Sequence, residues 1–261
     1  MIPARHASSR YPGKPLAGLR GAGGVSKTLI QRSWEAAKSV ADVTDCFVAT
    51  DDQRIADAVE AFGGDVLMTS TDCANGTERC AEAVQSLPTQ PDIVVNLQGD
   101  APLTPAWFIE ALVADMAERP DVRVATPVLR CDAHALQGFL DDRAAGRVGA
   151  TTAVFDKAGR ALYFSKEVIP YTGGELMKDG VCPVFHHVGV YAYRPDALGA
   201  YPDLAPGPLE KLEGLEQLRF MEHGLSVHCV EVSAQGAKFW ELNNPEDVPR
   251  IEAVLAEQGI L

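Results

Sequence analysis

Short hydrophobic runs alternate with amphipathic stretches along the first half of the chain. Four of the runs have the composition of β-strands, at residues 44–50, 65–68, 93–97 and 122–129. Between them, apolar residues recur at helical spacing and predict three helices, at residues 52–62, 76–84 and 105–117. Because strands and helices alternate, we expect an α/β fold: a mostly parallel sheet that lies between helices.

The pattern changes in the second half of the chain, which is predicted to form a β-rich lobe. Strands are expected at residues 150–156, 161–165, 188–193 and 226–232, and a final helix at 245–257. A long helix is predicted over 209–224, with Leu212, Leu215 and Leu218 facing inward. Since no repeat or linker interrupts the chain, we expect a single domain over residues 1–261, with the inserted lobe at about 148–225.

Polar segments follow the predicted strands at the points where those strands end. In open α/β sheets, ligands bind outside the carboxyl ends of the strands. Residues 5–14, 50–52 and 98–100 occupy such positions and are the candidates for a ligand site. Only Met1 and Ile2 precede the first of these segments, so we expect either a very short first strand or one that begins upstream.

The composition is that of a globular protein with an acidic surface. The chain has 261 residues, of which 46% are hydrophobic and 23% charged, and its net charge is −13. This charge disfavours binding to nucleic acid. The sequence has no run of 18 or more apolar residues, so no membrane span is predicted. Because the first residues do not resemble a signal peptide, we expect a cytoplasmic protein whose six scattered cysteines are free thiols.

One basic segment stands out against this acidic background. Residues 2–16 carry three permanent cations, Arg5, Arg10 and Lys14, together with two serines, three prolines and Gly13. Guanidinium and ammonium groups match phosphate oxygens, and a loop stiffened by proline loses less entropy on binding. The segment therefore predicts a triphosphate-binding loop; the alternative is a solvated basic loop.

Other candidate residues lie at predicted strand and helix ends. Asp100 follows a buried strand, and a carboxylate beside a phosphate-binding loop is typical of a Mg²⁺ ligand; the alternative is a turn or capping aspartate. Residues 75–79 form a glycine turn that opens a helix and could bind an anion or a base edge, unless this is an ordinary capped helix start. A strand histidine such as His187 is more often structural, and charges such as Glu213 on the 209–224 helix are more often solvated.

Taken together, these segments resemble the 3-deoxy-manno-octulosonate (Kdo) cytidylyltransferases, also called CMP-Kdo synthetases. The resemblance covers nearly the whole chain, because its motifs run in order from residue 2 to about residue 250. The motifs are residues 2–16, 49–52 (ATDD), 75–79 (NGTER), 98–100 (QGD), 159–165 (GRALYFS), 187–193 (HVGVYAY), 208–219 (PLEKLEGLEQLR) and 245–247 (PED). Several motifs in order are far more specific than any one of them.

The resemblance implies a nucleotidyltransferase fold, Rossmann-like and similar to the glycosyltransferase-A fold, in which the β-rich lobe binds the acceptor and forms a dimer contact. It implies a cytoplasmic homodimer that binds neither nucleic acid nor a membrane. The implied reaction uses CTP and Mg²⁺ and transfers CMP to a 2-keto-3-deoxy sugar acid, with release of pyrophosphate. In that family the anomeric hydroxyl of the acceptor attacks the α-phosphorus of CTP.

Roles are implied for the residues that match the family's motifs. Arg10 and Lys14 would hold the β- and γ-phosphates, and Asp100 would hold Mg²⁺ together with Asn243; Arg10, Lys14 and Asp100 are thus the catalytic candidates. The implied nucleotide-binding residues are Ala4, Arg5, Ser9, Arg10, Lys14, Asn75, Gly76, Thr77, Arg79 and Gln98. The implied acceptor-binding residues are Gln98, Tyr163, Ser165, Lys166, His187, Glu210 and Gln217.

Four positions depart from the residues that are usual in the family. Ala101 replaces a glutamate, and Asn243 replaces an aspartate that is a second Mg²⁺ ligand; Lys166 and His186 stand where an arginine and another basic residue are usual. Asn243 removes a negative charge from the metal site, and a lysine does not hold a carboxylate as an arginine does. Three interpretations stay open: Kdo as the acceptor, a different acid such as an amino-Kdo or a small phosphonate, or a nucleotide-binding protein without catalysis.

Overall fold

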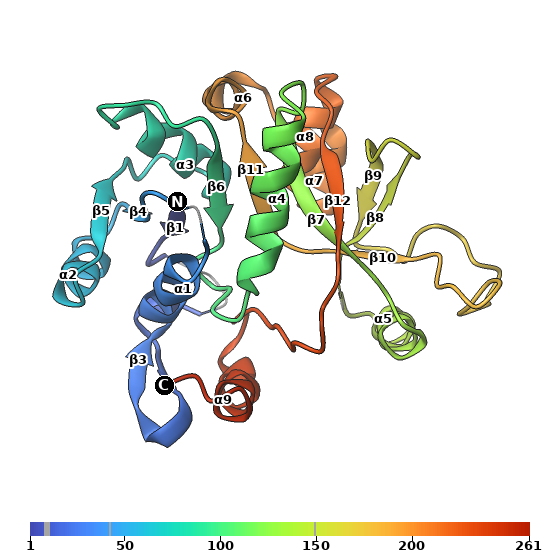
Figure 1. Ribbon diagram of the computed structural model, residues 1–261, viewed down its shortest axis with the longest axis horizontal. Helices are drawn as coiled ribbons and strands as arrows, with labels where there is room; N and C mark the ends of the chain where they lie inside the picture. The colour runs from blue at the N-terminus through green and yellow to red at the C-terminus, as the bar shows by residue number, and fades with distance from the viewer. Residues whose placement is uncertain (8–10, 42, 149) are drawn as a thin grey trace. The chain divides into compact units, whose positions relative to one another are not determined.

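The computed structural model describes residues 1–7, 11–41, 43–148 and 150–261. Their contacts divide the chain into two compact units (Figure 1). The first unit contains Met1–Glu110 and Gly236–Leu261, and the second contains Ala111–Gln235. The β-rich lobe expected at about 148–225 falls inside the second unit, and α4 (Ala106–Glu118) continues along the chain from the first unit into the second.

The first unit is built on a parallel sheet, as the alternating pattern predicted. Its strands, in sheet order, are β1 (Ile2–Ala4), β4 (Phe47–Thr50) and β5 (Asp65–Met68), and both pairings are parallel. β6 (Val94–Leu97) lies beside β1, because the Leu97 N–H donates to the Met1 carbonyl at 3.0 Å. Within this chain β1 has three residues.

Three helices of this unit begin at side-chain caps, which explains why their starts follow polar residues. They are α1 (Leu29–Lys38), α2 (Gln53–Ala61) and α3 (Gly76–Gln85). The side chains of Thr28, Asp52 and Asn75 accept hydrogen bonds from backbone N–H groups in the first turn of each helix. Sequence reasoning missed α1 because the polar residues Arg32 and Ser33 are buried on it and interrupt its apolar stripe.

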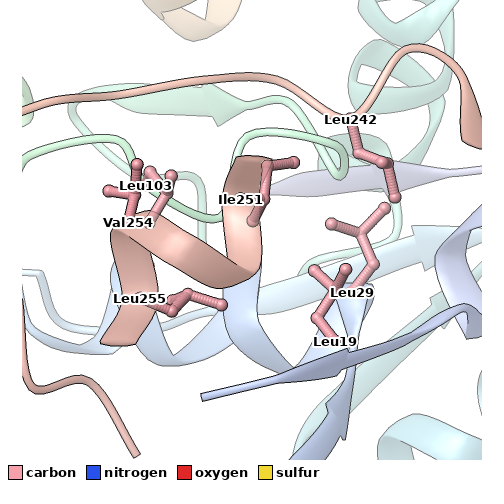
Figure 2. Close-up of a cluster of buried hydrophobic side chains, with 7 residues drawn as sticks. All are labelled: Leu19, Leu29, Leu103, Leu242, Ile251, Val254 and Leu255. Carbon is pink, nitrogen blue, oxygen red and sulfur yellow. The ribbon is translucent and has the colours of Figure 1, made fainter. Parts of the chain in front are cut away.

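The last helix packs against a hairpin near the start of the chain. The hairpin consists of β2 (Gly18–Arg20) and β3 (Ser26–Thr28), and the helix is α9 (Val248–Glu257), preceded by a 3-10 turn at Pro245–Asp247. Figure 2 shows the cluster that joins them: Leu19, Leu29, Leu103, Leu242, Ile251, Val254 and Leu255. Because Leu242 belongs to this cluster, the segment after it is held in the first unit.

The second unit is built on a mostly antiparallel sheet. Its strands are β7 (Val124–Arg130), β8 (Thr152–Phe155), β9 (Ala161–Ser165), β10 (Phe185–His187), β11 (Val190–Tyr193) and β12 (His228–Val232). Within this unit the order is β11-β7-β10-β8-β9, with every one of these pairings antiparallel, and β12 pairs with β7 in parallel. β11 pairs with the first residues of β7 and β10 with its last residues.

The predicted long helix over 209–224 is wrong. The structure has two short helices, α7 (Pro208–Glu213) and α8 (Gln217–Glu222), separated by Gly214 in the left-handed conformation with φ 61°. A glycine in this conformation ends a helix, and the Gly214 N–H closes α7 by donating to the Glu210 carbonyl. Leu212 is 83% exposed rather than inward, whereas Leu218 is buried as predicted.

Two other helices of the second unit, α5 (Ala133–Ala144) and α6 (Pro195–Ala200), were not predicted from the sequence. α5 buries Leu136 alone and so lacks an apolar stripe, and α6 is too short for a helical period to emerge. All six cysteines are free, as expected. In the part of the chain that the structure describes, no helix has the length and hydrophobicity needed to cross a membrane.

The backbone of Gly99 approaches that of Pro3 so closely that a side chain has no room. A Cβ atom at Gly99 would lie 2.7 Å from the Pro3 carbonyl oxygen, and the Gly99 carbonyl accepts a hydrogen bond from the Ser33 hydroxyl at 3.0 Å. The turn after β6 is therefore held against the end of β1 by its backbone.

We predict that Gly99→Ala lowers the free energy of unfolding by about 2 kcal/mol, because an overpacked backbone contact must be relieved by movement of β1 or β6. Urea unfolding measures the change. The control is Gly138→Ala in α5, where a Cβ would meet no atom within 4 Å; this variant should be unchanged or more stable by up to about 1 kcal/mol. Equal stability of the two variants would contradict the close contact.

Candidate functional site

The carboxyl ends of β1 and β6 and the start of α3 meet in the first unit. A Cβ atom at Gly76 would lie 3.3 Å from the Pro3 ring and 3.4 Å from the Gln98 side-chain oxygen. Ala4 is the last residue of β1 and is buried. The structure thus brings together Ala4, Gly76 and Gln98, which sequence analysis assigned to the nucleotide. Arg5, the next residue along the chain, is exposed.

An ion pair between Lys14 and Asp100 lies at this edge of the sheet. The Lys14 Nζ atom is 2.6 Å from Asp100 Oδ2, and the two side chains are 13% and 25% exposed. Lys14 is placed by the end of its loop, where Gly13 adopts φ 71° and donates from its N–H to the His6 carbonyl at 3.0 Å. The loop therefore holds a cation against the carboxylate that follows β6. The predicted ligands Ser9 and Arg10 lie outside the described residues.

The segment around Asn243 lies next to Asp100. The Leu242 N–H donates to the Asp100 carbonyl at 2.9 Å, so Asn243 is one residue from that backbone contact. Asp247 accepts from the N–H groups of Asn243 and Asn244 at 3.0 and 2.7 Å, and its carboxylate is used to cap the turn. The two proposed metal ligands are thus held close together along the backbone.

The described residues contain no group of three or more His, Cys, Asp or Glu side chains that could hold a metal ion. One carboxylate and a neighbouring amide nevertheless fit Mg²⁺, because this ion commonly binds one or two protein oxygens and completes its shell with water and substrate phosphates. Lys14 beside Asp100 adds a positive charge that matches a phosphate chain. The donor set suits a metal that arrives with its nucleotide, rather than one held by protein ligands alone.

The motif at residues 75–79 is a capped helix start. The Asn75 side chain accepts from the Glu78 N–H at 2.8 Å, and Glu78 in turn accepts from the Ala74 N–H at 2.8 Å. Thr77 is buried in the same turn. This arrangement is the simple alternative considered for the motif, and it leaves a role in nucleotide binding as a prediction.

Arg79 joins α3 to the ends of two strands. Its guanidinium is 3.2 Å from Asp51 Oδ2 after β4 and donates to the Thr69 hydroxyl after β5 at 2.5 Å. The side chain is only 3% exposed. Arg79 therefore links α3 to the residues after β4 and β5, and any contact that it makes with a nucleotide would be added to this structural pairing.

In the second unit, Glu213 accepts hydrogen bonds from three groups. Its carboxylate receives the Ser165 hydroxyl at 2.7 Å, the Lys166 N–H at 2.8 Å and the Tyr163 hydroxyl at 3.3 Å. The three donors belong to residues predicted to bind the acceptor. The prediction that Glu213 lies on a solvated face is wrong: it connects α7 to the end of β9, which a sequence pattern without tertiary contacts could not show.

Glu210 is held in a buried ion pair. Arg219 donates to both of its carboxylate oxygens, at 2.8 and 2.7 Å, and the Arg219 guanidinium also lies over the Tyr201 ring at 4.2 Å. This pairing joins α7 to α8 across Gly214. Removal of one partner of a buried ion pair is strongly destabilising, so Glu210 has a structural role whatever else it contacts.

Within the described part of the chain, His187 and Gln217 each have a side-chain nitrogen without a hydrogen-bond partner. His187 is 6% exposed; its Nε2 lies 2.9 Å from the Thr126 hydroxyl, and its ring contacts those of Phe164 and Tyr191. Gln217 is 2% exposed, and its Oε1 lies 3.0 Å from the Tyr191 hydroxyl. The Gln217 Nε2 atom is buried without a hydrogen-bond partner among the described residues. A buried unpaired donor is costly unless a ligand uses it.

Comparisons with known proteins show the family to which the chain belongs. A family model described as cytidylyltransferase matches residues 1–227. A 3-deoxy-manno-octulosonate cytidylyltransferase from Maricaulis maris is 42% identical over all of this chain and 98% of its own length. The chain belongs to the Kdo cytidylyltransferase family. A second member, from Chlamydia abortus, is 43% identical over 98% of this chain and 92% of its own.

Solved structures confirm the predicted nucleotidyltransferase fold. A CMP:2-keto-3-deoxy-manno-octonic acid synthetase complexed with CTP matches with a TM-score of 0.83 and 36% identity, over 98% of this chain and 97% of that one. A 4-diphosphocytidyl-2C-methyl-D-erythritol synthase from Anaerococcus prevotii matches over 97% and 96% with a TM-score of 0.55 at 13% identity, which is a likeness of fold alone. The family therefore has this fold in common with more distant nucleotidyltransferases.

We predict that His187 makes the protein less stable in mild acid. Burial, with a smaller contribution from His186, lowers the pKa of His187 from 6.5 to about 3. The unfolded chain takes up this proton below pH 6.5 and the folded chain does not, so folding loses free energy as the pH falls from about 6.5 towards 3. Between pH 6.5 and 4.5 the loss should be roughly 2 kcal/mol.

His187→Gln removes this titration and keeps a side chain that can form a hydrogen bond with the Thr126 hydroxyl. Urea unfolding of both proteins between pH 7.5 and 4.5 should show that the stability of the wild type falls more steeply than that of the variant. Parallel pH profiles would contradict a neutral buried His187.

Proposed function

We propose that this chain transfers CMP from CTP to Kdo and releases pyrophosphate. The observation that carries the proposal is the Lys14–Asp100 ion pair at the carboxyl end of β6, in a chain more than 40% identical to Kdo cytidylyltransferases over its whole length. A cation beside a carboxylate suits a magnesium–triphosphate complex, because it provides one group for the phosphates and one for the metal.

In the proposed reaction, the anomeric hydroxyl oxygen of the acceptor forms a bond to the α-phosphorus of CTP. The bond from this phosphorus to the bridging oxygen breaks, pyrophosphate leaves, and the hydroxyl proton is released. Lys14 and Arg10 hold the β- and γ-phosphates and stabilise the charge that develops on the leaving group. Asp100 and the Asn243 amide are the residues that would hold Mg²⁺, which neutralises phosphate charge when it is bound with CTP.

The other residues of the proposed site are assigned to the nucleotide or to the acceptor. The backbone near Ala4 and the residues Asn75, Gly76, Thr77 and Arg79 contact the cytosine, and Arg5 and Ser9 are assigned to nucleotide binding. Gln98 is assigned to both the nucleotide and the acceptor, near the sugar. The acceptor residues of the lobe at about 148–225 are Tyr163, Ser165, Lys166, His187, Glu210 and Gln217. We propose that this lobe also forms the contact of a cytoplasmic homodimer.

Pyrophosphate release tests the proposed function. CTP and Mg²⁺ should release pyrophosphate when Kdo is present, and the rate should be much lower with UTP or without an acceptor. Release with an amino-Kdo or a phosphonate acid but not with Kdo would favour a different acid acceptor. Tight binding of CTP without release for any acceptor would favour a protein that binds nucleotide without catalysis.

We predict that Lys14→Ala lowers kcat/KM for CTP by about 100-fold or more, because it removes a cation that stabilises charge on the phosphates in the transition state. The matched control is Lys38→Ala, which removes an exposed lysine from the last turn of α1 and should stay within about twofold of the wild type. If both variants kept full activity, Lys14 would belong to a solvated basic loop and not to the site.

We predict that Asn243→Asp lowers the Mg²⁺ concentration for half-maximal activity by about three- to tenfold, because a carboxylate attracts the ion more strongly than an amide. The control Asn244→Asp adds the same charge one residue further on, at the cap of the 3-10 turn, and should have a smaller effect. An unchanged Mg²⁺ dependence and turnover in Asn243→Asp would remove Asn243 from the metal site.

A further inference from the structure

The hydroxyl of Thr126 lies at an interruption in the pairing of β7 on the side of β10 and β11, while β12 pairs with Thr126 on the other side. β11 pairs with β7 up to Ala125, and β10 pairs with it from Val128 onward, so Thr126 faces the residues between the two strands. The residue is fully buried. Its Oγ1 atom has three polar neighbours: His187 Nε2 at 2.9 Å, the Val190 carbonyl oxygen at 2.8 Å and the Val188 carbonyl oxygen at 3.3 Å.

A count of protons decides which way these hydrogen bonds run. A hydroxyl has one hydrogen to donate, and a carbonyl oxygen can only accept. The close contact with the Val190 carbonyl therefore requires the Thr126 hydrogen, and Oγ1 is left with lone pairs facing His187. A short contact between this oxygen and Nε2 then needs a hydrogen on Nε2. In the opposite tautomer, one hydrogen would have to serve two acceptors at 2.8 and 2.9 Å.

The proton on Nε2 leaves Nδ1 of a neutral imidazole with a lone pair, so Nδ1 can only accept a hydrogen bond. Nδ1 has no hydrogen-bond partner within the described part of the chain. Unlike Nε2 of Gln217, it is not among the unpartnered atoms that are completely buried. Burial also keeps the ring uncharged, because it lowers the pKa of His187 to about 3. Nδ1 of such a ring can accept a hydrogen bond from a hydroxyl or an amine, but it has no hydrogen to donate to a carboxylate.

We infer that Thr126 is a positioning residue: it fixes His187 with its proton on Nε2, so that Nδ1 accepts a hydrogen bond from a hydroxyl group of the acid acceptor. The identity of the bound group rests on the proposed function, whereas the tautomer does not. Gln217 supports a ligand site beside His187. Among the described residues its Nε2 is a buried donor without a hydrogen-bond partner. Its Oε1 lies next to the hydroxyl of Tyr191, and the Tyr191 ring contacts that of His187. His187 and Gln217 together offer one acceptor and one donor, which match a hydroxylated chain.

The first test reads the tautomer directly. Protein labelled with ¹⁵N at histidine is examined by NMR, and the couplings between ring protons and ring nitrogens show which nitrogen of His187 carries the proton. The His187→Gln variant assigns its signals. We expect a neutral ring protonated on Nε2 at pH 7 in the wild type and in Thr126→Ser, which keeps the hydroxyl. Thr126→Val should populate the other tautomer. A ring protonated on Nδ1 in the wild type would overturn the inference.

The second test reads recognition of the acceptor. Thr126→Val should raise KM for Kdo about tenfold or more and leave KM for CTP within about twofold, because it disturbs one hydrogen bond to the acceptor alone. Thr126→Ser, which keeps the hydroxyl, should have a KM for Kdo close to that of the wild type. A role limited to the β7 pairing would instead lower stability and the amount of active enzyme with both KM values unchanged, and that result would overturn the inference.

Monodeoxy analogues of Kdo identify the bound hydroxyl. The analogue that lacks it should show the same KM with the wild type and with Thr126→Val, whereas the other analogues keep the difference. If every analogue kept the difference in KM between the wild type and Thr126→Val, Nδ1 would not accept a hydrogen bond from a hydroxyl group, and the inference would fail. A wild type that releases no pyrophosphate with Kdo would refute the proposed function, and the NMR result would still decide the role of Thr126.

Discussion

The first unit depends on a backbone contact that places one carboxylate. The Gly99 backbone packs against the Pro3 carbonyl with no room for a side chain, which holds the turn after β6 against the end of β1. Asp100, the next residue, is then held from two further directions, by the Lys14 ammonium at 2.6 Å and by the Leu242 N–H on its carbonyl. Segments that are far apart in sequence thus meet at one acidic residue. In a chain of net charge −13, the Lys14 ammonium is a cation at this edge that a phosphate chain can bind.

The second unit shows how buried polar groups divide between structure and ligand. Glu210 and Arg219 satisfy each other, and Glu213 is satisfied by Ser165 and the Lys166 N–H. These groups hold α7 and α8 on the sheet. His187 and Gln217 are as deeply buried, yet each keeps one polar atom without a hydrogen-bond partner among the residues that the structure describes. Because an unpaired buried group costs free energy, the contrast indicates where a polar ligand is expected.

The sequence pattern was informative where local and tertiary preferences agree. The helix α2 could be predicted because its buried residues recur at helical spacing, and the run 93–97 because a mostly buried strand is apolar along its length. The 209–224 segment failed because its leucines recur at helical spacing while Gly214 reverses the backbone between two short helices. The contacts of Glu213 and Arg79 could not be predicted, since their partners come from other elements and no spacing along the chain encodes them. Thr126 gave no signal at all, because a threonine in a strand is an ordinary residue.

The account rests on the claim that Asp100 and Lys14 receive the metal and the phosphates of CTP. A crystal structure of the CTP complex with Mn²⁺ in place of Mg²⁺ tests this claim most directly, because anomalous scattering locates the ion without assumptions about its ligands. The account predicts an anomalous peak at the Asp100 carboxylate, next to the α-phosphate, with the Lys14 ammonium on the β- or γ-phosphate. A metal peak away from Asp100, or a triphosphate that does not reach Lys14, would contradict it.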